Sequence, residues 1–188
     1  MAGRILKIPI NLTREEIYPF LGIRQDDIPV EIEELVSRYI PMVTRLAEPK
    51  GIWDTFPVGE AAGCRISLEK TSLLIEGEKT ACHFLTSERV TLFAVTIGSR
   101  VDSILEEIGQ KESSRALVFD GVASAAVEHA AGQLDSFLSR EIRRKGFFPT
   151  ARFSPGYGDW PLFWQKTFLD SIEACKIDLS CTPHFLLQ

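Results

Sequence analysis

The chain has 188 residues, 45% of them hydrophobic, and a formal net charge of −5. Such a chain can bury a sizeable core, most simply as one domain. Dispersed acidic charge argues against a nucleic-acid or anionic membrane surface, no apolar run approaches the ~20 residues that span a bilayer, and no secretion signal opens the sequence, so we expect a cytoplasmic protein.

The N-terminal half predicts helices followed by strands. Thr13 and Glu16 form a capping-box pattern that opens a short helix, which ends near Gly22. Apolar residues at helical spacing predict a longer helix over residues 30–43. The other elements expected here are two strands and a short helix, at residues 50–56, 64–75 and 79–85.

The C-terminal half opens with a strand of nearly continuous apolar residues, 90–97, which predicts burial on both faces. Three helices follow, at residues 99–108, 114–145 and 161–175. Small residues in the first half of the longest helix permit close approach of another element or a ligand. Because strands and helices do not alternate regularly, we predict an α+β single domain with a twisted, mostly antiparallel sheet and flanking helices.

Residues 152–161, Arg-Phe-Ser-Pro-Gly-Tyr-Gly-Asp-Trp-Pro, predict a ligand-binding loop. Pro155 fixes its own φ, while Gly156 and Gly158 allow left-handed conformations, so the loop could present bare backbone to a small molecule. Arg152 supplies a planar fork of donors for a carboxylate or phosphate. An ordinary turn beside an arginine salt bridge is the alternative.

Aromatic side chains add a second feature to this loop. Tyr157 and Trp160 could stack on a flat ring of a ligand.

A cluster of basic residues precedes the loop, at the end of the longest predicted helix. Cations there complement the helix dipole, and we favour this structural role over contact with nucleic acid. The residues of the cluster are Arg140, Arg143, Arg144 and Lys145.

Other chemistry receives little support. The cysteines lack zinc-site spacing, and the histidines form no recognisable catalytic arrangement, so we assign neither a metal site nor a catalytic residue. Cys175, Cys181 and His184 leave a metal or redox site open as a minor alternative. The cysteines and histidines are Cys64, Cys82, Cys175, Cys181, His83, His129 and His184.

The segment Arg152–Tyr157 resembles the Arg-x-x-Pro-Gly-Tyr motif in the activation domain of cobalamin-dependent methionine synthase, the module that binds S-adenosylmethionine. Residues 93–98, and residues 120–123 followed by Glu128, are similar to that domain in order and spacing. The resemblance is strongest to small stand-alone forms in which Gly-Asp follows Pro-Gly-Tyr. It covers about residues 92–185, so 91–188 is the expected core and 1–90 is only weakly matched.

The resemblance implies an S-adenosylmethionine site on the loop and the long helix. Arg152 would hold the ligand's carboxylate and Glu128 would lie near its amino group, although a solvated helix carboxylate is the alternative for Glu128. The implied binding residues are Arg152, Ser154, Pro155, Gly156, Tyr157 and Glu128. The family's N-terminal aspartate has no assigned counterpart.

The implied function is that of an accessory reactivation component in methionine biosynthesis rather than an independent enzyme. It would support reductive methylation of cobalamin carried by a methionine synthase or another corrinoid protein, with flavodoxin or ferredoxin as the reductant. The alternative is a non-catalytic scaffold of corrinoid or one-carbon metabolism that has lost S-adenosylmethionine binding. That alternative arises because the family domain continues with an aromatic-bearing strand beyond the position matching residues 184–188.

Overall fold

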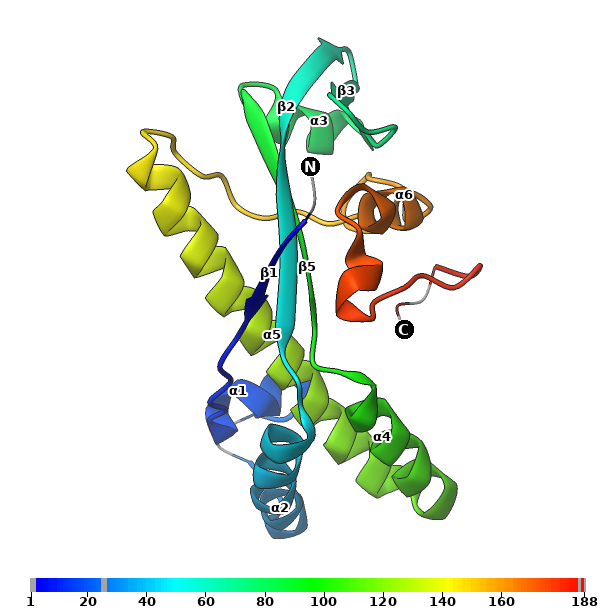
Figure 1. The fold of residues 1–188 in the computed structure, drawn as a ribbon. Helices are drawn as coiled ribbons and strands as arrows, with labels where there is room; N and C mark the ends of the chain where they lie inside the picture. The colour runs from blue at the N-terminus through cyan, green and yellow to red at the C-terminus, as the bar shows by residue number, and fades with distance from the viewer. Residues whose placement is uncertain (1–2, 25–26, 186, 188) are drawn as a thin grey trace. The chain divides into compact units, whose positions relative to one another are not determined.

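The structure is a computed structural model that describes residues 3–24, 27–185 and 187, and Figure 1 shows its elements. The α-helices are α1 (Arg14–Ile17), α2 (Val30–Leu46), α3 (Glu78–Phe84), α4 (Ser99–Lys111), α5 (Ser113–Arg144) and α6 (Trp164–Ser171). Two 3₁₀ helices accompany them, η1 (Tyr18–Leu21) and η2 (Ala174–Ile177). The strands are β1 (Arg4–Lys7), β2 (Lys50–Ala62), β3 (Arg65–Leu68), β4 (Leu74–Glu76) and β5 (Arg89–Thr96).

The strands form one sheet in the order β1-β2-β3-β4, and β5 pairs with β2. β2 and β3 are antiparallel, with Ala62 opposite Arg65, and β3 and β4 are also antiparallel. The register of β2 shifts between Val58 and Ala61, as at a β-bulge, which bends a strand locally. The predicted α+β class with an antiparallel sheet is confirmed.

Both ends of the first helical segment agree with expectation, whereas α2 and α4 each continue three residues beyond their predicted ends, to Leu46 and Lys111. The Glu16 carboxylate accepts a hydrogen bond from the backbone N–H of Thr13 at 2.8 Å, and the Thr13 side chain faces the backbone N–H of Glu16 in return, which makes the capping box of α1. The Thr13 hydroxyl also donates to the Glu16 carboxylate at 3.1 Å. The helical segment continues through η1 and ends at Gly22, whose φ of +66° lies in the left-handed region. These two residues therefore begin and end the segment as predicted.

Several strands differ from expectation. The strand predicted over 64–75 is two strands, because Lys70 adopts a φ of +65° between β3 and β4. β1 was not predicted, and β2 extends six residues beyond the predicted end at Phe56, to Ala62. β5 is not buried on both faces throughout, since its last four residues are only half-buried.

The chain divides into two compact units, each assembled from distant segments. The first contains Met1–Leu6, Ile52–Ala94 and Ser139–Gln188, and the second contains Lys7–Gly51 and Val95–Leu138. β2, β5 and α5 contribute residues to both units. The prediction of one domain over residues 1–188 stays a prediction.

The first unit has a core of aliphatic side chains from the sheet, α3, α6 and η2. Phe56, Trp160 and Leu169 pack in the same core. Its fully buried members include Ile52, Ile66, Leu73, Ile75, Ile172 and Ile177. The predicted helix over 161–175 is shorter in the structure, because α6 ends at Ser171 and a residue with left-handed backbone, Glu173, separates it from η2.

The second unit is helical and packs α1, η1, α2 and α4 around α5. Phe119 of α5 is fully buried and meets Tyr39 of α2 edge to face, with ring centroids 5.3 Å apart. The small residues of α5 allow the close approach that we predicted, because a Cβ at Gly121 would overlap the side chain of Leu21. Gly121 therefore makes room for η1.

Candidate ligand-binding loop

Residues 145–163 connect α5 to α6 within the first unit, and the Pro-Gly-Tyr motif forms a tight turn in the second part of this connection, residues 151–163, the candidate loop. The Tyr157 amide donates to the Ser154 carbonyl at 3.1 Å, and Gly156 has a φ of +91°. A proline followed by a residue with positive φ between these hydrogen-bonded ends is the pattern of a type II turn. Pro155 is buried, while Tyr157 keeps 70% of its surface exposed.

A second turn closes the loop on itself. The Trp160 amide donates to the Tyr157 carbonyl at 3.2 Å, and the Gly156 amide donates to the Trp160 carbonyl at 2.9 Å. Gly158 lies between these residues with a φ of +59°. The prediction that the loop presents bare backbone is therefore wrong for the amides of Gly156, Tyr157 and Trp160, which all have partners within the loop.

Trp160 is a core residue. It is only 3% exposed, and its indole N–H donates to the Leu74 carbonyl at 3.1 Å. The expectation that it stacks on a ligand is wrong, because its ring packs in the core of the first unit, where Phe168 meets it with ring centroids 6.3 Å apart. A buried indole that finds a hydrogen-bond acceptor is a stable arrangement.

Asp159 has a role that the sequence did not reveal. Its carboxylate accepts the backbone N–H groups of Lys79 at 2.8 Å and Thr80 at 3.0 Å, at the N-terminus of α3. The Thr80 hydroxyl also donates to it at 2.6 Å. The only available signal was indirect, because Gly77, the residue before α3, has no side chain with which to cap the helix.

The predicted loop residues lie together, and Glu128 lies elsewhere in the chain. Arg152 and Ser154 are exposed at the start of the loop, and the Ser154 hydroxyl donates to the Pro155 carbonyl at 3.4 Å. Glu128 is an exposed residue of α5 in the second unit. The pairing of Arg152 with Glu128 around one ligand stays a prediction.

Next to Glu128, His129 connects α5 to the capping box of α1. Its Nδ1 lies 3.0 Å from a Glu16 carboxylate oxygen. The pKa of Glu16 is lowered from its ordinary value of 4.5, chiefly by the Thr13 backbone N–H and next by His129. His129 therefore has a structural partner within the second unit, a contact that sequence spacing did not predict.

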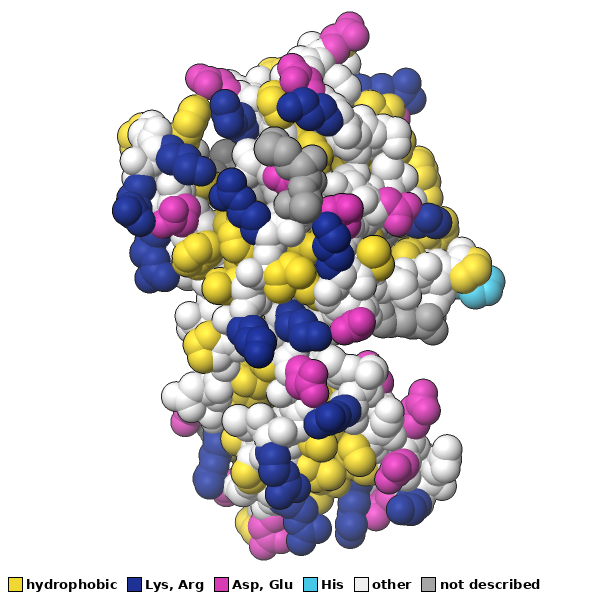
Figure 2. Space-filling model, viewed as in Figure 1, with side chains coloured by type: hydrophobic (Ala, Val, Ile, Leu, Met, Phe, Trp, Pro, Cys, Tyr) yellow, Lys and Arg dark blue, Asp and Glu magenta, His cyan; other side chains and the backbone are white. Residues whose placement is uncertain are grey.

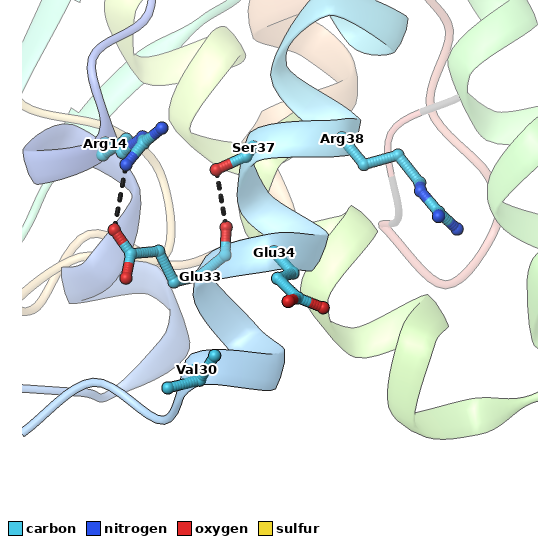
Figure 3. A pocket seen from close by; sticks show the side chains of 6 residues that line it. All are labelled: Arg14, Val30, Glu33, Glu34, Ser37 and Arg38. Carbon is cyan, nitrogen blue, oxygen red and sulfur yellow. Dashed lines mark hydrogen bonds and ion pairs between the residues drawn. The ribbon is translucent and has the colours of Figure 1, made fainter.

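A shallow concavity of about 470 Å³ lies in the second unit, between α1 and α2 (Figure 3). In it, Arg14 pairs with Glu33 at 2.9 Å, and the Ser37 hydroxyl donates to the Glu33 carbonyl at 2.7 Å. None of the predicted site residues lines it. Because the Glu33 carboxylate already pairs with Arg14, we assign no ligand to this concavity.

Figure 2 shows Lys and Arg side chains gathered over the C-terminal end of α5, where Arg144 pairs with Glu141 at 2.9 Å. All four cysteines are free thiols. Within residues 3–24, 27–185 and 187, no three His, Cys, Asp or Glu side chains converge as metal ligands, and no helix is long and apolar enough to cross a bilayer.

Comparisons with known proteins agree with this architecture. No protein-family model matches the chain, and no curated protein matches it. Among solved structures, it is similar to the MetH reactivation domain bound to AdoHcy, with a TM-score of 0.67 over 100% of this chain and 75% of that chain. Sequence identity is 14%. The predicted resemblance is thus confirmed at the level of structure: the chain has the fold of the MetH reactivation domain.

Proposed function

We propose that this protein binds S-adenosylmethionine and serves as a reactivation module for a separate cobalamin-dependent methionine synthase or another corrinoid protein. The proposal combines the shared fold with the Arg-x-x-Pro-Gly-Tyr motif. A fold can host unrelated functions, so the assignment depends on the site. The observation that carries it is the turn at Pro155 and Gly156, which leaves Tyr157 70% exposed in the same loop as an exposed Arg152.

The donor set of the loop fits the head group of S-adenosylmethionine. Arg152 offers a guanidinium fork that matches a carboxylate through two parallel hydrogen bonds. An exposed aromatic ring such as Tyr157 offers a face for a sulfonium cation or an adenine ring. Glu128 is proposed to meet the amino group, because a zwitterion is selected by charges of both signs.

The backbone of the loop is also suited to binding, because its shape is fixed in advance. A Cβ at Gly156 would meet Leu162 at 2.9 Å, and one at Gly158 would meet Phe153 at 3.0 Å. Side chains at either position would therefore displace packed neighbours as well as strain the backbone. A loop with one stable conformation loses less entropy on binding.

This chain's contribution would be positioning rather than covalent chemistry. When bound, S-adenosylmethionine supplies the methyl group that the partner's cobalamin accepts. Arg152 and Tyr157 would fix the orientation of the ligand, and orientation alone can account for a large share of a rate enhancement. The proposed reductant is a small electron-transfer protein such as flavodoxin or ferredoxin, and the proposed pathway is methionine biosynthesis.

Calorimetric titration tests the ligand directly. S-adenosylmethionine and S-adenosylhomocysteine are each titrated into the wild type, Arg152→Ala, Arg152→Lys and the control Arg143→Ala. Losing the partner of a carboxylate costs roughly 2 to 5 kcal/mol, so Arg152→Ala should weaken Kd by at least about 30-fold. Arg152→Lys should recover part of the affinity, because lysine keeps the charge without the fork. Arg143→Ala removes an exposed cation of α5 and should bind like the wild type.

Two results would count against the proposal. A wild-type protein that binds neither S-adenosylmethionine nor S-adenosylhomocysteine would leave the scaffold function as the better account. Equal binding by the wild type and Arg152→Ala would show that the ligand is held elsewhere. Thermal melting of every variant checks that each remains folded.

A further inference from the structure

The candidate loop is attached to the segment that contains β4 and α3 at several points. The indole N–H of Trp160 in the loop donates to the Leu74 carbonyl at 3.1 Å, and that of Trp164, the residue of α6 that follows the loop, donates to the Glu76 carboxylate at 2.8 Å. At the other end of the loop, His83 Nε2 lies 2.9 Å from the Ala151 carbonyl oxygen. Between these attachments, Asp159 is the loop residue that reaches the N-terminus of α3.

Asp159 occupies the position of a missing helix cap. α3 begins after Gly77, which has no side chain, so its first amides need an acceptor from another part of the chain. A Cβ at Gly77 would lie 2.5 Å from the Asp159 carboxyl carbon, so only glycine leaves room for this carboxylate. The same carboxylate accepts the hydroxyl of Thr80, a residue with 0% exposure. The carboxylate therefore accepts three hydrogen bonds from two consecutive residues of α3.

The attachment has a direct bearing on the ligand loop. Asp159 lies two residues after Tyr157, and the two hydrogen bonds that close the second turn both end on its neighbour Trp160. Moving Asp159 would therefore move the residues that close the turn around Tyr157. We infer that Asp159 is a positioning residue, whose contact with the N-terminus of α3 holds the Arg152–Tyr157 segment in its binding conformation.

This inference rests on the proposed function for its ligand, but the positioning itself can be measured without one. The variant Asp159→Asn keeps the size of the side chain and replaces one acceptor oxygen with an amide donor. It should expose the amides of Gly156, Tyr157 and Trp160, because their hydrogen bonds are internal to the loop. Hydrogen exchange of the unliganded protein at these three amides should accelerate at least about tenfold.

Two controls separate positioning from general stability. Asp170→Asn removes an exposed carboxylate of α6, which pairs with Lys166 at 2.7 Å, and should leave exchange in the loop unchanged. Ile177→Val removes one methyl group from a fully buried side chain in the same unit and lowers overall stability. If Asp159 acts by positioning, Ile177→Val should leave both loop exchange and the affinity for S-adenosylhomocysteine close to those of the wild type.

Binding completes the test. In calorimetry with S-adenosylhomocysteine, Asp159→Asn should weaken Kd at least about tenfold, with Thr80→Val intermediate and Thr80→Ser, which keeps the hydroxyl, near the wild type. Faster exchange together with weaker binding supports the inference. Unchanged exchange, or faster exchange with unchanged Kd, overturns it. A wild type that does not bind S-adenosylhomocysteine contradicts the proposed function alone, and the exchange data then still decide whether Asp159 holds the loop.

Discussion

Helices α1 and α3 receive their N-terminal caps from very different distances along the chain. At α1, Thr13 and Glu16 are three residues apart and complete the cap within the helix itself. At α3 the acceptor is Asp159, 80 residues beyond Lys79. A local cap stabilises its own helix, whereas a remote cap also fixes the segment that supplies it. The start of α3 is therefore coupled to the candidate ligand loop.

We expect the largest effect on stability from substituting Gly77, the residue against which the Asp159 carboxylate packs. In Gly77→Ala, the new Cβ would lie 2.5 Å from the Asp159 carboxylate, at a φ of +116°. Strain and displacement of the cap should together lower the free energy of unfolding by at least about 2 kcal/mol, measured by urea denaturation. Gly63→Ala is the matched control, because Gly63 also has a positive φ but has open space around it. Equal losses in the two variants would show that the contact with Asp159 is unimportant.

A smaller effect is expected at the local cap. Thr13→Ala should lower the free energy of unfolding by about 1 kcal/mol, as is usual for loss of an N-cap side chain. Hydrogen exchange should accelerate in α1 and η1 and remain unchanged at Gly156, Tyr157 and Trp160. Faster exchange at those loop amides would contradict the distinction between a local and a remote cap.

The smallest effect concerns the titration of the two capping carboxylates. The pKa of Asp159 is lowered from 3.8 to about 2, foremost by the Thr80 hydroxyl, and that of Glu16 is lowered from 4.5, foremost by the Thr13 backbone N–H. Because folding lowers both pKa values, each ionised carboxylate stabilises the folded protein at a pH above its ordinary pKa. That stabilisation is lost as the pH falls through the lower pKa of the folded state.

Carboxyl-carbon chemical shifts measure both titrations in one sample. Thr80→Val should raise the midpoint of Asp159 from about pH 2 toward 3.8 and leave that of Glu16 in place. If the Asp159 midpoint does not move in Thr80→Val, the hydroxyl is not the main cause of its low pKa.

Much of the fold follows from signals within a few residues of each element. The capping box at Thr13, the left-handed Gly22 and the helical periodicity of α2 are all local, and the structure has each where it was predicted. The boundary between β3 and β4 was missed because Lys70, rather than a glycine, adopts a positive φ there. A lysine gives no sequence signal for that conformation.

The candidate site was predictable in composition but not in contacts. The proline and glycines of the loop indicated a turn, and a turn is present. The roles of Trp160 and Asp159 depend on Leu74, Lys79 and Thr80, which are about 80 residues away in sequence. Such partners are chosen by tertiary packing, so a single sequence carries no pattern that pairs them.

The positions in the chain of the segments that form the first unit also determine when this unit can fold during synthesis. Its segments come from both ends of the chain, and the Gly3 amide donates to the Glu173 carboxylate across 170 residues. The second unit draws only on residues 7–51 and 95–138, so its helices can assemble earlier. Because contacts between distant residues slow folding, the candidate loop should reach its final structure later than the helices of the second unit during synthesis.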